Sequence, residues 1–264
     1  MDNIELMLNK LFENKVVLIE NIYLKNKEKF YWYDINDKYI SINLPNNIIH
    51  DEYIKKDILE NALLLDKNMG IIDCGAHIGD GVIPIAHALK ILKREDIIIY
   101  ALDPCINKCN AIKYLAYKNN LKNIKIINCG LTDKPCLLYP NIPNVDSQGL
   151  PDKNTGGTVW IPEKINLAGN AHLYKVGEPF YFKTLEDLII NKEINHNIGL
   201  IHLDVEDHEY KVLSGSLNII NKFMPYISLE DHNNDIQKFE KLLKNYKFVK
   251  RIEQNNIFIP IHRD

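Results

Sequence analysis

Residues 71–81 read IIDCGAHIGDG. Ile71 and Ile72 end an apolar run, Gly75 opens a turn, and residues 79–92 have the spacing of a helix. In such a strand–turn–helix unit a ligand can contact bare backbone N–H groups, because glycine has no Cβ to keep it away. The stretch therefore predicts an α/β fold with a nucleoside-type ligand at this turn.

The spacing within the turn discriminates between nucleoside ligands. Dinucleotide sites use G-x-G-x-x-G to hold a pyrophosphate, whereas Asp73, Gly75 and Gly79 give D-x-G-x-x-x-G here. A carboxylate before the turn suits a cationic ligand and would repel phosphate. S-adenosylmethionine carries an ammonium and a sulfonium, so it is the expected cofactor. A nicotinamide-dependent oxidoreductase remains the alternative.

Apolar strands and helical segments alternate through most of the chain. Residues 96–104, 124–130, 199–206 and 225–232 have the pattern of strands that are buried on both faces, and helical segments lie between them. This alternation predicts a doubly wound, mainly parallel sheet with helices on both sides. Residues 184–194 should form a helix capped by Thr184, and residues 247–261 a hairpin around Asn255–Asn256.

Two regions depart from this alternation. Residues 1–68 are expected to form an α+β cap with helices near 1–13 and 52–65 and short strands that turn at Asn36–Asp37. Residues 69–264 would then form the ligand-binding domain. Within it, residues 138–182 are rich in proline and asparagine and are expected to be a structureless, lid-like insertion.

Composition excludes several classes of protein. The net charge of −3 argues against a protein that binds nucleic acid by charge alone, and 46% hydrophobic residues suffice for a buried core. The five cysteines contain no C-x-x-C pair, so we expect neither a disulfide framework nor a zinc knuckle. The first residues lack the apolar region of a signal peptide, and no run is long enough to span a membrane. We expect a cytoplasmic protein.

Residues after the strands complete the predicted cofactor site. A carboxylate at Asp103 can accept hydrogen bonds from ribose hydroxyls, and the third strand ends where the adenine should lie. The predicted cofactor-binding residues are Asp73, Gly75, Ala76, His77, Gly79, Asp80, Asp103, Pro104, Gly130, Leu131 and Asp204.

Acids and histidines follow the fourth and fifth strands. Because the carboxyl ends of parallel strands share one edge of the sheet, these side chains should converge beside the cofactor. The predicted catalytic residues are Asp204, Glu206, His208, Glu230 and His232. His208 is the candidate base, since its intrinsic pKa fits proton transfer near neutral pH, and Glu206 could serve if desolvated.

Four motifs resemble those of FkbM-type S-adenosylmethionine-dependent methyltransferases: IIDCGAHIGDG at 71–81, LDP at 102–104, IHLDVEDHEYKVLSG at 201–215 and YISLEDH at 226–232. The resemblance implies a class I sheet of seven strands with the last antiparallel. It also implies O-methylation of a sugar, a polyketide or another small hydroxylated molecule. Asp207 stands where this family usually has glycine.

Other interpretations stay open. Mg²⁺ held by Asp204, Glu230 or Asp231, and Asn233 could activate the acceptor hydroxyl, although a metal-free site is favoured. The chain could also bind a nucleoside without turnover. A small-molecule or sugar acceptor is expected, and a nucleic-acid partner is not, because the lysines are interspersed with acids. The sequence leaves the oligomeric state undetermined.

Overall fold

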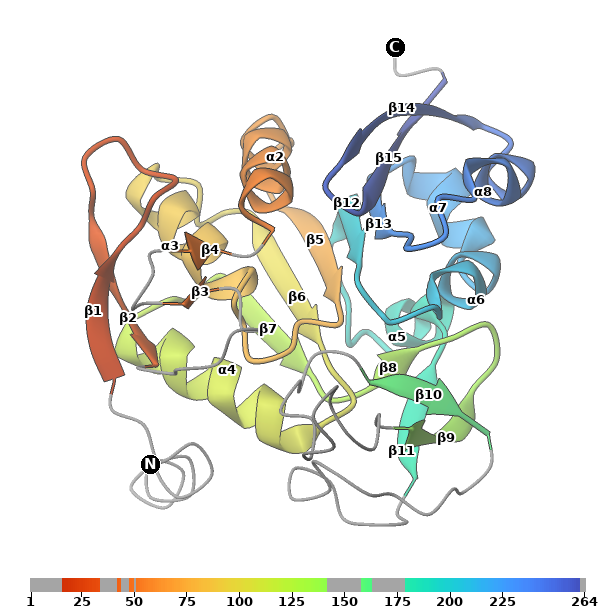
Figure 1. Cartoon of the computed structure of the whole chain (residues 1–264), viewed down its shortest axis with the longest axis horizontal. Coiled ribbons are helices and arrows are strands. Elements are labelled where there is room, and N and C mark those ends of the chain that lie inside the picture. Colours follow the sequence, from red (N-terminus) through yellow and green to blue (C-terminus); the bar gives the residue numbers. More distant parts are fainter. Residues whose placement is uncertain are drawn as a thin grey trace, which may run out of the picture.

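A seven-stranded sheet forms the centre of the computed structural model, which describes residues 16–33, 42–43, 48–49, 51–141, 158–162 and 179–261 (Figure 1). The strand order is β14-β15-β13-β12-β5-β6-β7. The strands are β5 (Met69–Cys74), β6 (Ile98–Leu102), β7 (Ile124–Ile127), β12 (Asn197–Leu203), β13 (Tyr226–Glu230), β14 (Tyr246–Ile252) and β15 (Asn255–Pro260).

This sheet is mixed. The strands from β7 to β13 pair in parallel, whereas β15 is antiparallel to both of its neighbours. The expectation of a mainly parallel sheet is therefore wrong for the β14–β15 edge, whereas the seven strands, the C-terminal hairpin and the antiparallel last strand are present as expected. Ile252 pairs with Asn255, so the hairpin turn is residues 253–254, and so short a connection forces an antiparallel pair. Asn255 and Asn256, where the turn was predicted, lie instead in β15, directly after the observed turn.

Helices cover both faces of the sheet. Ile71 and Ile99 belong to one buried cluster together with residues of α2 (Glu52–Leu63), α3 (Val82–Ile91) and α4 (Ile106–Lys118). Their neighbours Ile72 and Tyr100 belong to a second cluster on the other face. That cluster includes residues of α5 (Leu185–Ile190), α6 (Glu209–Ser214), α7 (Leu217–Phe223) and α8 (Ile236–Leu242). The predicted α/β architecture is confirmed.

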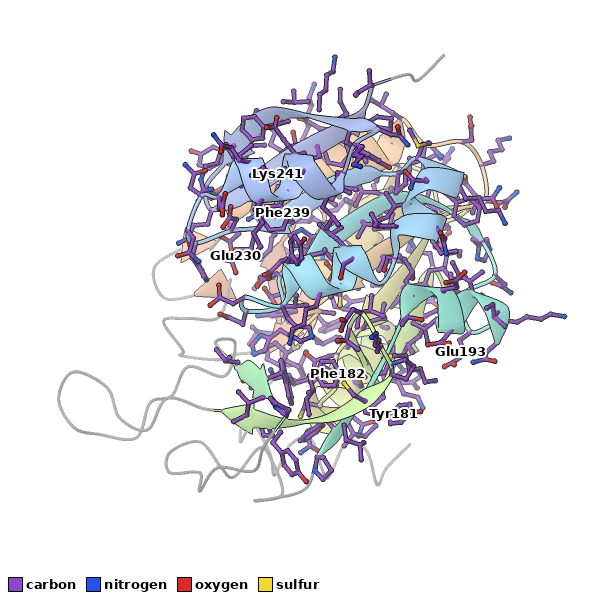
Figure 2. All side chains as sticks on the ribbon, turned by 90° about the vertical axis from the view of Figure 1, so that its right-hand side faces the viewer. Tyr181, Phe182, Glu193, Glu230, Phe239 and Lys241 are labelled. Atoms are coloured by element: carbon purple, nitrogen blue, oxygen red, sulfur yellow. The ribbon has the colours of Figure 1, made fainter. Side chains whose placement is uncertain are left out.

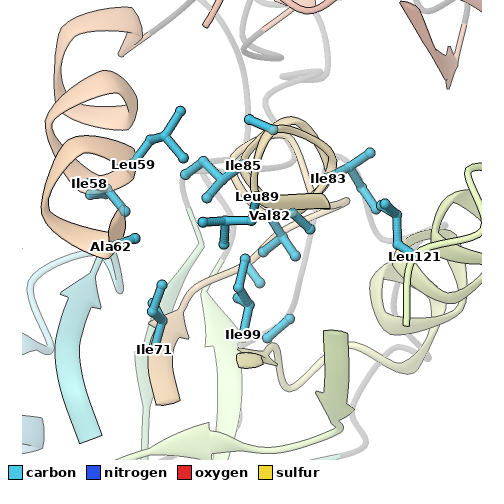
Figure 3. Packing of buried hydrophobic residues seen from close by; sticks show 14 of the residues in the cluster. Ile58, Leu59, Ala62, Ile71, Val82, Ile83, Ile85, Leu89, Ile99 and Leu121 are labelled. Carbon is cyan, nitrogen blue, oxygen red and sulfur yellow. The ribbon is translucent and has the colours of Figure 1, made fainter. Parts of the chain in front are cut away.

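The first cluster joins α2 to the sheet (Figure 3). Ile58 and Leu59 of α2 belong to the same cluster as Val82 and Ile85 of α3 and Ile71 of β5. A helix from the expected N-terminal cap thus contributes directly to the core beneath the glycine turn.

A hairpin of β1 (Val16–Glu20) and β2 (Lys29–Tyr33) packs near α3 and α4. Trp32 is fully buried, and Asn119 Oδ1 accepts a 2.6 Å hydrogen bond from the Tyr31 N–H. β3 (Ile42–Asn43) and β4 (Ile48–Ile49) form a short antiparallel pair. The predicted helix at 1–13 and the turn at Asn36–Asp37 lie outside the described residues.

The region expected to be a structureless insertion contributes strands instead. β8 (Gly130–Leu131), β9 (Cys136–Asn141), β10 (Val159–Ile161) and β11 (Phe180–Lys183) form a second sheet in the order β10-β9-β11-β8. In β11, Phe182 is buried while Tyr181 is exposed, the alternation of a strand with one covered face. Residues 142–157 and 163–178 lie outside the described residues.

Two helix boundaries can be compared with the sequence pattern: the start of α5 and the break between α6 and α7. The Thr184 cap is present, because Thr184 Oγ1 accepts a 3.0 Å hydrogen bond from the Asp187 N–H and the Asp187 carboxylate bonds back to the Thr184 N–H. The helical segment between β12 and β13 is divided into α6 and α7 at Gly215–Ser216. Among the described residues, no helix combines the length and apolar character that crossing a membrane requires.

Candidate functional site

A cavity of about 240 Å³ lies at the carboxyl ends of β5, β6, β12 and β13. Most of the predicted site residues line it: Asp73, Gly75, Ala76, His77, Asp80, Asp103, Pro104, Gly130, Leu131, Asp204, Glu206, Glu230 and His232. Four other predicted residues are not part of its lining: Gly79, His208, Asp231 and Asn233.

Gly75 brings the ends of three strands together. Its φ is +89°, its N–H donates to the Leu102 carbonyl at 3.0 Å, and the Asp204 N–H donates to the Cys74 carbonyl at 3.0 Å. A Cβ at Gly75 would lie 1.7 Å from the Asp204 carbonyl oxygen. The glycine therefore permits a backbone contact that sets the ends of β5 and β12 side by side.

Asp73 is a half-buried acid at the end of β5. Burial raises its pKa to about 7, and the charges of Asp80 and Asp204 add to the rise, while Lys55 opposes it. Because desolvation and the neighbouring acids destabilise the charged carboxylate, a cationic ligand beside it would stabilise that form. The position suits an ammonium group.

Asp103 is the corresponding acid at the end of β6. Its Oδ1 accepts a 2.8 Å hydrogen bond from the Cys105 N–H, and Lys108 Nζ lies 3.9 Å from its Oδ2. Burial raises its pKa, and the Lys108 charge limits the rise. The carboxylate retains lone pairs with which it can accept hydrogen bonds from the hydroxyls of a ribose.

Asp204 and Glu230 form a coupled pair between β12 and β13. Their carboxyl groups are hydrogen-bonded to each other. Burial and the charge of Glu206 raise the pKa of Asp204, although the hydrogen bond to Glu230 lowers it, and burial and the charge of Asp204 raise the pKa of Glu230. Two close carboxyl groups in a buried site cannot both ionise freely, so the pair retains a proton near neutral pH.

His232 connects this pair to Glu206. Its Nε2 lies 3.4 Å from Glu230 Oε2 and 3.8 Å from Glu206 Oε2. Its Nδ1 is hydrogen-bonded to the Gln254 side-chain oxygen. Because that oxygen accepts, Nδ1 carries the hydrogen in this assignment, which leaves Nε2 of the neutral ring able to take a proton.

The surroundings of His232 favour its protonated form. Burial lowers its pKa, but the hydrogen bond to Gln254 and the charge of Glu206 outweigh burial and raise the pKa above its ordinary value. The side chain is 43% exposed, so it can exchange protons with solvent.

His208, the predicted base, is buried outside this cavity. Its Nε2 lies 3.0 Å from Thr132 Oγ1, its ring packs on Phe182, and burial lowers its pKa to about 4. The prediction that it lies beside the catalytic acids is wrong. Glu206 (φ 54°) and Asp207 (φ 68°) adopt left-handed backbone conformations in succession, which turns the chain between Asp204 and His208.

The left-handed conformation of Asp207 also explains a departure from the family motif. Glycine reaches this region without the steric penalty of a Cβ, and aspartate tolerates it better than most residues do. A position where the family usually has glycine can therefore hold aspartate here with little change of the backbone.

Of the predicted metal ligands, Asp204 and Glu230 are hydrogen-bonded to each other, whereas Asp231 and Asn233 lie outside the cavity lining. Asp231 Oδ2 accepts a 2.9 Å hydrogen bond from Asn256 Nδ2, and its Oδ1 accepts one of 3.1 Å from the Asn233 N–H. Among the described residues, the group whose ligand atoms lie within 4.8 Å of one another is Glu206, Glu230 and His232. Two carboxylates and an imidazole fit a divalent transition metal better than Mg²⁺.

Several cavity residues were missed by the sequence analysis, and they come from three separate elements. Lys55 lies on α2 and Gln254 on the β14–β15 turn, and Phe182 lies on β11, where Trp160 packs against it with ring centroids 5.2 Å apart. Phe182 and Glu230 are labelled in Figure 2 on β11 and β13. A lysine next to Ile54 and three residues before Ile58, on the apolar side of a predicted helix, was a signal that could have been used.

One histidine and two cysteines near the cavity have structural surroundings. His202 is half-buried and lines the cavity, with Nδ1 3.2 Å from Ser228 Oγ, and desolvation lowers its pKa to about 4. Cys74 and Cys129 are buried free cysteines, and burial raises the pKa of both thiols. A raised thiol pKa disfavours the nucleophilic thiolate.

The family model of the methyltransferase FkbM domain matches residues 73–250, which contain the glycine turn and the strand ends that form the cavity. The chain belongs to the FkbM methyltransferase family. No curated protein sequence matches the chain.

Solved structures with a similar fold include methyltransferases. An FkbM methyltransferase from Methylobacillus flagellatus is 13% identical, with a TM-score of 0.48 over 73% of this chain and 43% of that one. A SAM-dependent methyltransferase from Aquifex aeolicus is 13% identical, with a TM-score of 0.41 over 79% and 89%. A Streptococcus mutans protein in complex with SAH is 12% identical, with a TM-score of 0.42 over 80% and 97%. This FkbM-family chain therefore spans less than half the length of the first of these structures.

Proposed function

We propose that this FkbM-family protein transfers a methyl group from S-adenosylmethionine to a hydroxyl of a small molecule or sugar. One observation carries the proposal: His232 presents a basic nitrogen 3.4 Å from Glu230, in the same cavity as Asp73. A proton acceptor thus lies in one cavity with a site suited to a cation.

Asp73 and Asp103, the acids at the ends of β5 and β6, favour one orientation of the cofactor. The adenosine would lie over β6 and β8, with its ribose hydroxyls at Asp103 and its adenine near Gly130 and Leu131. The amino-acid end would lie over β5, with its ammonium at Asp73. The sulfonium between them would be favoured by the negative charge of the cavity.

The transfer is an in-line displacement. The acceptor oxygen forms a bond to the methyl carbon as the carbon–sulfur bond breaks, and the sulfur retains that electron pair. The hydroxyl proton passes to His232 Nε2, and Glu206 and Glu230 stabilise the resulting imidazolium. The products are a methyl ether and S-adenosylhomocysteine, and the protein contributes mainly position and a base.

The negative charge of the cavity favours an acceptor that carries no negative charge. Seven carboxyl groups line it, and both of its lysines lie close to one of them, Lys55 at Asp80 and Lys108 at Asp103. Such a lining disfavours phosphorylated acceptors and nucleic acid. Neutral sugars and polyols are the acceptors that we expect.

A divalent metal at Glu206, Glu230 and His232 is the second possible source of hydroxyl activation. When bound, it would lower the pKa of an acceptor hydroxyl by direct coordination. It would also occupy His232 Nε2, the atom that acts as the base in the metal-free mechanism, so the two mechanisms are mutually exclusive.

The test is transfer from S-adenosylmethionine with an isotopically labelled methyl group. Neutral sugars, polyols, sugar phosphates and RNA are offered as acceptors, and the labelled product is identified by mass spectrometry. We expect a labelled ether from a neutral acceptor. No product with any acceptor, or product with RNA alone, would contradict the proposal.

His232→Asn tests the base. The variant should lose about 100-fold or more in rate, the usual contribution of a general base, while its affinity for S-adenosylhomocysteine stays unchanged. The wild-type rate should rise with pH through the raised pKa of His232, because only the neutral ring accepts the proton. His208→Asn is the matched control, and it should keep this pH profile. A wild-type rate in His232→Asn would exclude His232 as the base.

A further inference from the structure

Lys55 brings an ammonium group from α2 into the cavity. The residue is 6% exposed, and its Nζ lies 3.0 Å from Asp80 Oδ2, on the turn that follows β5. A Cβ placed on Gly81 would be 3.6 Å from Lys55 Cε, so the lysine stem lies against the same turn. Burying so long a charged side chain is unusual unless the charge is paired.

The two lysines of the cavity divide it into two ends. Lys108 lies beside Asp103, at the end expected to hold adenosine. Lys55 lies beside Asp80, and its charge lowers the pKa of Asp73, so it belongs to the end expected to hold the amino-acid group. Among the described lining residues, these two are the lysines, and arginine is absent.

The amino-acid end of S-adenosylmethionine carries two opposite charges. Asp73 can hold the ammonium, but the carboxylate would meet Asp73, Asp80 and Asp204 in the same cavity. Burying that carboxylate without a cation would be costly. An ammonium has three donors, so Lys55 can keep its bond to Asp80 and donate to a second acceptor.

We propose that Lys55 binds the carboxylate of the methyl donor. This inference rests on the proposed function and extends it, because it gives the N-terminal segment a direct part in cofactor recognition. It also makes the site selective: a nucleoside with the same sulfonium and ammonium but no carboxylate would not offer Lys55 this acceptor.

The experiment compares S-adenosylmethionine with decarboxylated S-adenosylmethionine by isothermal titration calorimetry on the full chain. The two ligands differ only in the carboxylate. Wild-type protein should prefer the carboxylated ligand by about tenfold or more, the usual effect of a hydrogen bond to a charged group. In Lys55→Met this preference should fall to roughly twofold or less, and Lys55→Arg should restore part of it.

Lys108→Met is the matched control, since it removes the other buried lysine of the cavity. It should weaken both ligands by similar factors and keep their ratio, because it acts at the adenosine end. Thermal melting of each variant verifies that it is folded.

The outcomes separate the inference from the proposed function. If Lys55→Met keeps the wild-type preference, or if wild-type protein shows none, Lys55 does not bind the carboxylate while the cofactor assignment stands. If the folded wild-type protein binds neither ligand, both the cofactor assignment and the role of Lys55 fail.

Discussion

Asp73 should make the ligand affinity of this cavity depend on pH. A pKa raised to about 7 means that the carboxylate is fully charged only above that pH. Since the charged form holds the ligand ammonium, affinity for S-adenosylhomocysteine should fall as the pH is lowered from 8 to 6. Titration of a single group can change the affinity by at most about tenfold per pH unit. Calorimetry at pH 8, 7 and 6 measures this, and Asp73→Asn should flatten the profile.

The same group makes a prediction of opposite sign for the ligand-free protein. A carboxyl group whose pKa is raised on folding binds its proton more tightly in the native state. Its contribution to the free energy of unfolding therefore decreases as the pH rises from about 4 to 7.

An affinity for S-adenosylhomocysteine that is independent of pH over 6 to 8 would show that Asp73 does not hold the ammonium.

Gly75 is the residue whose substitution should be least tolerated. In Gly75→Ala the new Cβ would meet the Asp204 carbonyl at 1.7 Å, and the positive φ adds strain. Because the carbonyl oxygen belongs to the backbone and the position of a Cβ is fixed by its own backbone, relief requires that β5 and β12 separate. We expect a loss of about 3 kcal/mol or more, or failure to fold, measured by chemical denaturation.

Gly81→Ala is the matched control for this substitution. Its φ is −87°, and the nearest heavy atom to a new Cβ is the far end of Lys55 at 3.6 Å, an ordinary contact. The variant should stay within about 1 kcal/mol of wild type. Equal stability of Gly75→Ala and wild type would mean that the turn is not fixed by this close approach.

At the scale of elements, α2 carries Lys55, and three polar contacts hold the helix. The Glu253 carboxylate of the β14–β15 turn accepts a 3.2 Å hydrogen bond from the Ile54 N–H in the first turn of the helix. On the next turn, the Asp57 carboxylate accepts hydrogen bonds from Tyr226 Oη and Lys250 Nζ. The helix is thereby anchored to β13 and β14.

Asp57→Ala should weaken this anchor. The buried Tyr226 hydroxyl would lose its acceptor, and an unsatisfied buried polar group costs about 1–3 kcal/mol. Chemical denaturation measures the change, and Glu60→Ala on the exposed side of the same helix should stay within about 0.5 kcal/mol of wild type. Equal effects of the two substitutions would contradict the anchoring role of Asp57.

The elements differ in how well the sequence predicted them. Strands β5, β6, β12 and β13 are buried on both faces, so their continuous apolar runs and the helices between them were evident. Strands β10 and β11 have only three and four residues, long segments separate β9, β10 and β11 along the chain, and the prolines of this region suggested loops. Pairing between distant segments decides such strands, and local pattern does not reveal it.

At the scale of the whole molecule, ligand binding should raise the melting temperature. A ligand at about 100 times its dissociation constant adds roughly 2.7 kcal/mol, which is several degrees for a chain of this size. We expect S-adenosylmethionine and S-adenosylhomocysteine to stabilise the protein and NAD to have no effect. Stabilisation by NAD alone would overturn the cofactor assignment.

The sequence by itself determined the α/β class, the family and the two strand-end acids Asp73 and Asp103, because each depends on a residue pattern local to one strand and its turn. It also indicated that acids and histidines gather at one edge of the sheet, since parallel strands place their carboxyl ends together.

Only the tertiary structure decided which of those side chains face the cavity. Two successive left-handed residues, Glu206 and Asp207, turn His208 into the core, while the β14–β15 hairpin brings Gln254 to His232. Lys55 reaches the site because α2 packs across the sheet. These placements depend on backbone direction and long-range packing, which residue spacing along the chain does not specify.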